Sequence, residues 1–290
     1  MGNICNLCPR KCSVDRTISK GYCSQGTLKV ARASLHEWEE PIISGTNGSG
    51  TVFFSGCNLK CVYCQNYEVS RGKGKDITPK ELADIFKKLE DMGAHNVNLV
   101  TPTHFVDDIM RACEIYKPSI PIAYNCGGYE SIDTLERLKG IVDIFMPDFK
   151  YSDNALAKKY SNCHNYYETC TSAIIKMREL CPVDLVQDGI MKSGMIIRHL
   201  VLPNAIDNTK GVIDWIANNM AKDTYVSLMG QYVPFGEADR YPEINRKLKP
   251  IEYKIAINYL LQKAFDNAFV QSLESADENF IPDFNENSLI

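Results

Sequence analysis

Three closely spaced cysteines are the residues in this chain best suited to chemistry. Cys57, Cys61 and Cys64 form a C-x3-C-x2-C pattern on one short stretch. Thiolates suit iron–sulfur clusters and zinc. The next candidate ligands, His95 and Cys113, are distant in sequence, so three thiolates on a [4Fe–4S] cluster would leave one iron with an open position. An open position at a metal implies catalysis. The alternatives are a zinc site completed from afar, or three buried structural cysteines.

A second group of cysteines stands near the start of the chain, at Cys5, Cys8, Cys12 and Cys23. Four thiolates at this spacing fit one metal centre, which would be either a zinc ion or a [4Fe–4S] cluster. Reduced structural cysteines or disulfides are the other interpretation. We expect the cysteines on or beside predicted helices to be core residues; these are Cys113, Cys163, Cys170 and Cys181.

Composition narrows the class of protein. The chain has 290 residues, 12 cysteines, 44% hydrophobic residues and a net charge of −4. It is too long for a disulfide scaffold of the secreted type, and its charge does not predict a nucleic-acid or anionic-membrane partner. The start lacks a signal-peptide pattern, and no apolar run could span a bilayer. We therefore expect a cytoplasmic protein with reduced thiols, which usually serve metals or redox chemistry.

Six short apolar runs alternate with amphipathic helical patterns through the middle of the chain. Such runs are typical of parallel strands buried on both faces, and they lie at 51–54, 97–101, 120–124, 142–146, 195–202 and 224–229. Helices are expected from Thr78 and at 106–116, 131–138, 169–180, 208–220 and 253–265. The pattern predicts an α/β fold, either a partial (β/α)6 barrel or a doubly wound sheet, with function at the carboxyl ends of the strands.

The predicted domains are an N-terminal cysteine-rich segment (1–45), a barrel (46–230) and a C-terminal loop, helix and acidic tail (231–290). Residues 45–50, flanked by Ile42-Ile43 and by residues 52–54, are expected to form a hairpin or tight turn that leads into the first strand. Residues 264–290 contain acids but no Lys or Arg, which predicts a solvated terminal extension.

These motifs resemble the radical S-adenosylmethionine (SAM) superfamily. Its signature has three cysteines at this spacing, with an aromatic residue such as Tyr63 before the third, after the first strand of a partial (β/α)6 barrel. Asn66, two residues after Cys64, is similar to the activating enzymes of glycyl radical enzymes. Residues 145–150 resemble the group's Met-x-Asp-x-Lys strand, and 197–203 resemble its Arg-containing strand ending in Val-x-Pro. The whole chain most resembles a pyruvate formate-lyase activating enzyme-like subgroup.

The resemblance implies a chemistry. Cys57, Cys61 and Cys64 would ligate a [4Fe–4S] cluster, and SAM would chelate its fourth iron. One electron from a low-potential donor, flavodoxin or ferredoxin, would cleave SAM to methionine and a 5′-deoxyadenosyl radical that abstracts hydrogen from a substrate. The expected substrate is a glycyl radical enzyme. The alternatives are a different macromolecule, a small molecule, or a non-catalytic Fe–S or zinc protein.

The resemblance also implies SAM contacts from Tyr63, Thr101 and Asn125. Residues 101–104 replace the family's glycine-rich motif, and the Thr101 hydroxyl could accept a hydrogen bond from the SAM ammonium group. Thr103 could instead cap the following helix. Asn125 occupies the place of the family's Asp-Thr-Asn-Gly, although the glycines that follow it could be a plain turn.

Charged residues at two strand ends complete the predicted site. Asp148 and Lys150 alternate on a strand and so share one face. A charged pair there is costly without a ligand or partners, so the choice is a site or a structural salt bridge. In the family the lysine contacts the SAM carboxylate, and the Met and Asp hold a cation. Arg198 suits a carboxylate or a hydroxyl group of SAM, or else forms an ion pair. His104 and His199 are candidate acids or bases, or structural histidines.

Overall fold

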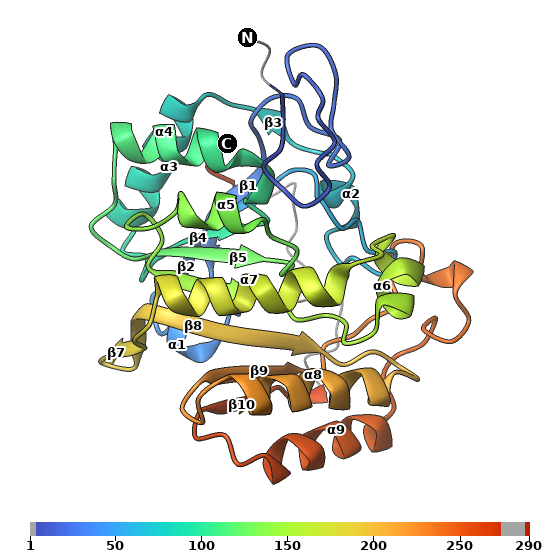
Figure 1. Cartoon of the computed structure of the whole chain (residues 1–290). Helices are drawn as coiled ribbons and strands as arrows, with labels where there is room; N and C mark the ends of the chain where they lie inside the picture. Colours follow the sequence, from blue (N-terminus) through green and yellow to red (C-terminus); the bar gives the residue numbers. More distant parts are fainter. Residues whose placement is uncertain (1–3, 274–287) are drawn as a thin grey trace.

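A single mixed sheet forms the centre of the molecule. The computed structural model describes residues 4–273 and 288–290. The strands follow the order β10-β9-β8-β6-β5-β4-β2-β1-β3, and β7 pairs with β8 outside this path (Figure 1). Their bounds are β1 Lys29–His36, β2 Ser49–Phe54, β3 Lys75–Asp76, β4 Val97–Val100, β5 Ile122–Cys126, β6 Ile144–Pro147, β7 Leu185–Gln187, β8 Ile190–Leu200, β9 Tyr225–Met229 and β10 Ala268–Val270.

The six predicted strands are confirmed. They correspond to β2, β4, β5, β6, β8 and β9, which pair in parallel. Within the described ranges the two ends of the sheet, β10 and β3, do not pair with each other. The sheet is therefore open, which confirms the partial barrel. Three strands that pair with this set were not predicted: β1 and β7 are antiparallel to β2 and β8, and β10 extends the parallel edge beside β9.

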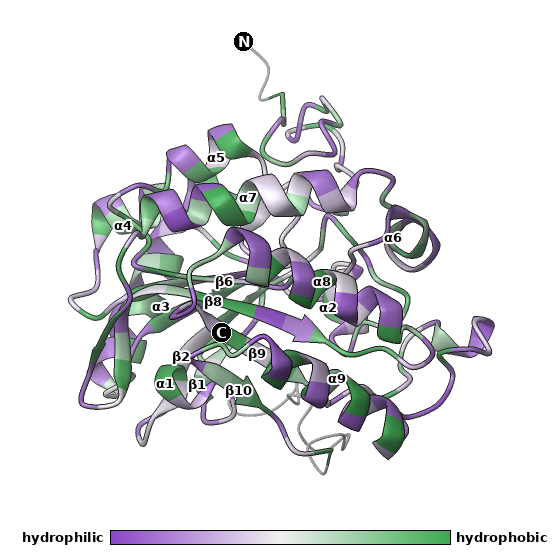
Figure 2. Cartoon of the chain, turned by 60° about the horizontal axis from the view of Figure 1, so that its bottom comes forward, coloured by the Kyte–Doolittle hydropathy of each residue, from purple (hydrophilic) through white to green (hydrophobic). Residues whose placement is uncertain are grey.

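Helices cover the outer face of the sheet (Figures 1 and 2). The best-defined start is that of α3, where Thr78 and Glu81 form a reciprocal capping box before Pro79. The helices are α1 Pro41–Ser44, α2 Tyr67–Ser70, α3 Pro79–Asp91, α4 Val106–Ile115, α5 Ile132–Glu136, α6 Asn154–Ser161, α7 Tyr166–Leu180, α8 Ile206–Asn219 and α9 Pro250–Gln262. No helix in the described part of the chain is both long and apolar enough to cross a bilayer.

The expected hairpin before β2 is wrong in one respect. Ile42 and Ile43 belong to the short helix α1, which interrupts the connection between β1 and β2. Pro41 sits at the first turn of this helix, where a proline is well tolerated. Ile43 is fully buried and packs in one cluster with Ala123, Ile144 and other residues from β5, β6 and β8. The helix therefore closes the inside of the barrel near the amino ends of these strands.

The first and last strands of the described chain both belong to the sheet. The sheet runs past residues 45 and 230, because β1 and β10 are part of it; the domain boundaries there stay predictions. Most of the predicted solvated extension lies outside the described residues. The last residues return to the sheet, where the Leu289 amide donates to the Ala33 carbonyl at 2.8 Å.

Candidate active site

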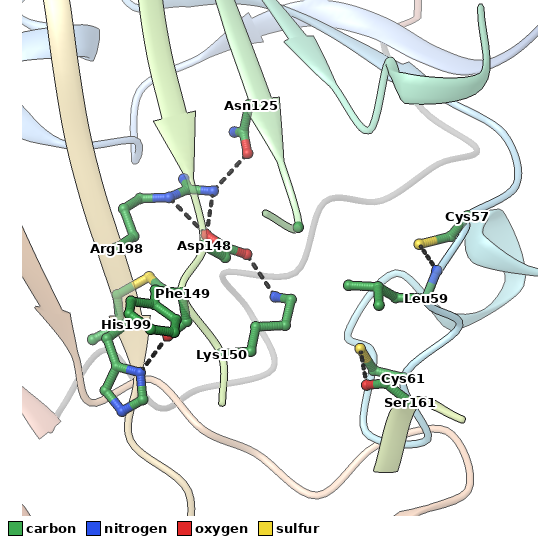
Figure 3. Close-up of polar contacts among 12 residues, drawn as sticks. Cys57, Leu59, Cys61, Asn125, Asp148, Phe149, Lys150, Ser161, Arg198 and His199 are labelled. Atoms are coloured by element: carbon green, nitrogen blue, oxygen red, sulfur yellow. Dashed lines mark hydrogen bonds and ion pairs between the residues drawn. The ribbon is translucent and has the colours of Figure 1, made fainter. Parts of the chain in front are cut away.

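The three cysteines lie on the loop that follows β2 (residues 56–66, the three-cysteine loop). Gly56 starts it at φ +84°, and a side chain there would meet the Cys23 carbonyl oxygen at 2.3 Å, so only glycine fits. The Leu59 amide donates to the Cys57 sulfur at 3.3 Å, and the Ser161 hydroxyl donates to the Cys61 sulfur at 2.9 Å (Figure 3). Hydrogen bonds of this kind stabilise thiolates, the form that binds metal.

The donor set fits a [4Fe–4S] cluster. Burial raises the pKa of the Cys64 thiol to about 12, with further increases from Cys61 and Cys57, while Lys150 opposes the shift. The three thiols therefore lie within electrostatic reach of one another. Among residues 4–273 and 288–290, no three Cys, His, Asp or Glu side chains converge on a point that would suit one metal ion. Three thiolates on one loop match the cysteine ligands of a [4Fe–4S] cluster, in which each iron takes its own sulfur.

Four predicted residues meet beside this loop. Lys150 Nζ lies 2.6 Å from Asp148 Oδ2, and Arg198 donates to Asp148 Oδ1 through Nε at 2.9 Å. Arg198 Nη2 also donates to Asn125 Oδ1 at 2.5 Å. Figure 3 shows Lys150 between Asp148 and the three-cysteine loop. The residues come from the carboxyl ends of β5, β6 and β8, where parallel sheets place their sites.

The charges in this group stabilise one another. Burial alone would raise the pKa of Asp148, but Arg198 and Lys150 outweigh it and hold that pKa below its usual range. Burial likewise disfavours the charged form of Lys150, yet Asp148 raises its pKa above normal. The site therefore holds a carboxylate between two cations.

Two glutamates that the sequence did not indicate join the same network. Glu39 Oε2 lies 3.2 Å from Arg198 Nη1, and Asn125 Nδ2 donates to Glu39 Oε1 at 3.4 Å. Glu40 is 4% exposed; burial raises its pKa although Arg198 opposes the shift. Both residues lie directly before α1 in the sequence. The chain that leads into this helix therefore places the two carboxyl groups beside Arg198. No local motif marks them, because Glu39 and Arg198 are 159 positions apart in sequence.

Thr101 has an unusual backbone conformation, whereas the Thr103 side chain has a buried hydrogen-bond partner. Thr101 has φ +59°, a conformation that favours glycine, at the position of the family's glycine-rich motif. Its amide donates to the Asn125 carbonyl at 2.8 Å. The expected helix cap by Thr103 is wrong: its hydroxyl donates to Glu130 at 2.7 Å, and α4 has no side-chain cap. Thr103 lies in the 3-10 turn Thr103–Phe105, so Phe105 and not Thr103 stands directly before α4.

The side chain of Tyr63, which belongs to the three-cysteine loop, is 5% exposed and lies buried beneath that loop. Its hydroxyl lies 2.7 Å from that of Tyr151, which lies 2.8 Å from the Ser161 hydroxyl. Since Ser161 donates to Cys61, these side chains form one hydrogen-bonded chain to the ligand sulfur. A contact between Tyr63 and SAM stays a prediction.

The two histidines have structural partners. Burial lowers the pKa of both His104 and His199 to about 4. His104 Nε2 lies 2.7 Å from the Ser55 carbonyl, and His199 lies between the Phe149 carbonyl and the Thr209 hydroxyl. Both rings are neutral at physiological pH and are engaged within the core.

Glu130 provides a test of the electrostatics near the site. Burial raises its pKa from 4.5 to about 7, while hydrogen bonds from Thr103 and Tyr124 oppose the shift. The folded chain thus binds this proton more tightly than the unfolded chain, so the free energy of unfolding should fall by about 3 kcal/mol as pH rises through this range. Glu130→Gln should remove that component in urea titrations between pH 5 and 8. Parallel stability curves for the two proteins would contradict it.

The fold and the three-thiolate loop together define an iron–sulfur enzyme built on an open barrel. The chain belongs to the radical SAM superfamily, whose sequence model matches residues 51–195. A [4Fe–4S] cluster and SAM are therefore its cofactors, as expected from the cysteine spacing and the resemblance.

Two curated relatives are similar over different lengths. An uncharacterized protein of Methanocaldococcus jannaschii is 34% identical over 264 residues, which cover 87% of this chain and 73% of that protein. A pyruvate formate-lyase-activating enzyme of Clostridium pasteurianum is 29% identical over 125 residues, which cover 39% of this chain and 50% of that enzyme.

Two solved structures share the fold. Streptococcus suis SuiB bound to its precursor peptide SuiA matches with a TM-score of 0.53 and 17% identity, over 76% of this chain. HydG, a maturase of the [FeFe]-hydrogenase, matches with a TM-score of 0.51 and 16% identity, over 74% of this chain. This chain spans 48% of each. At such identities the likeness shows the fold alone.

Proposed function

We propose that this enzyme cleaves SAM reductively and abstracts a hydrogen atom from a protein backbone, as an activase of a glycyl radical enzyme. The partial similarity to the activating enzyme of Clostridium pasteurianum supports this substrate. Asn66 supports it too, because the resemblance to activases includes this position. Its carboxamide oxygen is buried without a hydrogen-bond partner in the described ranges, so it is available to a ligand.

The observation that carries the radical chemistry is the position of Lys150 beside the three-cysteine loop. Cys57, Cys61 and Cys64 would hold the cluster, which supplies the electron that breaks SAM when it is bound and reduced. The Lys150 ammonium suits the SAM carboxylate. Arg198 and Asp148 position Lys150, and the tyrosines around Cys61 exclude water from the sulfur.

A second candidate function keeps the chemistry and changes the substrate to another macromolecule or a small molecule. The chain departs from the activase pattern at Thr101 and Asn125. Its more extensive similarity is to an uncharacterized protein, over 87% of the chain, and the activase match covers 39%. These observations favour a related enzyme with a different target.

One experiment tests the proposal in two stages. The protein, reconstituted anaerobically with iron and sulfide and then reduced, should convert SAM to 5′-deoxyadenosine; no product from cluster-loaded protein would overturn the radical chemistry. Each glycyl radical enzyme encoded in the same genome is then added, and an EPR doublet should appear in one of them. Product without a doublet in any partner favours the second candidate. Ferredoxin and flavodoxin are then compared as the electron donor that we propose.

A further inference from the structure

Four cysteines at the start of the chain stay outside the site described above. All four thiols are free, and Cys5, Cys8 and Cys23 are buried. The segment that carries them, residues 5–25 (the N-terminal cysteine segment), contains no helix or strand beyond the bridge between Ile4 and Asp15. Its conformation therefore depends on turns and on side-chain contacts and not on a sheet or helix of its own.

The turns around two of these cysteines resemble the start of the three-cysteine loop. The backbone amide of Arg10 interacts with the Cys8 thiol, and that of Gln25 interacts with the Cys23 thiol. In both cases the amide lies two residues after the cysteine, as Leu59 does after Cys57. Amide groups directed at sulfur favour the thiolate, which is the metal-binding form.

The backbone brings the four cysteines together. A side chain at Gly21 would lie 3.2 Å from the Cys12 sulfur and 3.6 Å from the Cys23 sulfur, so both sulfurs border the same glycine. Cys5 is joined to the same place through Val14: the Cys5 amide donates to the Val14 carbonyl at 2.9 Å, and the Val14 side chain also borders Gly21. A turn joins Cys8 to Cys12, with the Lys11 amide donating to the Cys8 carbonyl at 3.0 Å. Four thiolates are the complete protein ligand set of a [4Fe–4S] cluster, in which each iron takes one cysteine sulfur.

We propose that Cys5, Cys8, Cys12 and Cys23 ligate a second [4Fe–4S] cluster, which fixes the N-terminal cysteine segment against the three-cysteine loop. The segment already contacts that loop directly. Arg10 Nε donates to the Asn58 carbonyl at 2.8 Å, and Lys60 Nζ donates to the Ser24 hydroxyl at 2.6 Å. The cluster would therefore order the surface on which the catalytic loop rests.

Metal counting on the full chain tests this site. Anaerobically reconstituted wild-type protein should contain about eight irons. A variant with all four N-terminal cysteines changed to Ser should contain about four, and so should a variant with Cys57, Cys61 and Cys64 changed to Ser. The matched control, Cys113→Ser, should keep all eight. One zinc per chain that disappears only in the N-terminal variant would overturn the cluster, and about four irons in wild type that the N-terminal substitutions leave unchanged would overturn the site.

Thiol protection keeps the proposal testable if the quadruple variant fails to fold. Folded, cluster-loaded wild-type protein is treated anaerobically with iodoacetamide, before and after removal of iron with a chelator, and its peptides are mapped by mass spectrometry. Cys12, the half-exposed member of the group, should be labelled only after iron is removed. Equal labelling of Cys12 in both states would contradict ligation.

Discussion

Replacing Cys61 with alanine should abolish 5′-deoxyadenosine formation. The substitution removes one of three sulfurs from the loop, so the cluster loses a ligand. Loss of residues that only support metal ligands already costs about 10- to 100-fold in affinity or activity, so loss of a ligand should cost more than about 100-fold. The Ser161 hydroxyl loses its acceptor sulfur but keeps its contact with Tyr151, so the fold should persist.

The measurement is product formed per mole of protein under single-turnover conditions, with iron content determined on the same samples. Iron should fall by about four per chain, with no loss at the N-terminal cysteine segment. Cys163→Ala is the matched control, because Cys163 is also buried but lies outside the loop; it should keep both iron and activity. Full activity in the Cys61→Ala protein would mean that the cluster is held elsewhere.

The parts of the fold that were predicted from the sequence depend on local patterns. The strands β2, β4, β5, β6, β8 and β9 are short and largely apolar, since both faces of the sheet are covered. The antiparallel strand β1 was missed because Lys29, Arg32 and His36 interrupt its apolar pattern. The helix α1 was missed because its four residues are fewer than hydrophobic periodicity can detect.

The same distinction applies to the site. The three cysteines could be predicted because all three lie on one loop, and their spacing is itself the signal. Asp148 and Lys150 could be predicted because two charged residues beside an apolar strand are costly to bury unless they have partners or a ligand. Glu39 and Glu40 could not, because their role depends on how α1 closes the barrel. Nothing in the neighbouring sequence encodes the contact between Glu39 and Arg198.

Replacing Asp148 with asparagine should destabilise the protein by about 3 kcal/mol. The Asp148 carboxylate lies between Lys150 and Arg198, and its removal leaves two largely buried cations facing each other. Removing one partner of a buried ion pair typically costs about 3–5 kcal/mol; Glu39 partly neutralises Arg198, so we expect the lower end. Lys150 has no other ion-pair partner within 4-273 and 288-290. The melting temperature should fall by roughly 6 °C or more.

Asp107→Asn is the matched control for Asp148→Asn, because Asp107 pairs with Arg137 at an exposed position and should contribute less than about 1 kcal/mol. The pH dependence identifies the cause. A carboxyl group whose pKa is lowered on folding contributes stability above its unfolded value of 3.8, and that stability is lost only as pH falls through the lowered folded pKa. The difference between wild type and Asp148→Asn should therefore stay constant from pH 8 to pH 5 in thermal melts. A variant as stable as wild type would contradict this prediction, because it would show that Glu39 and Glu40 balance Lys150 and Arg198 without Asp148. The role of Asp148 would then be in binding and not in stability.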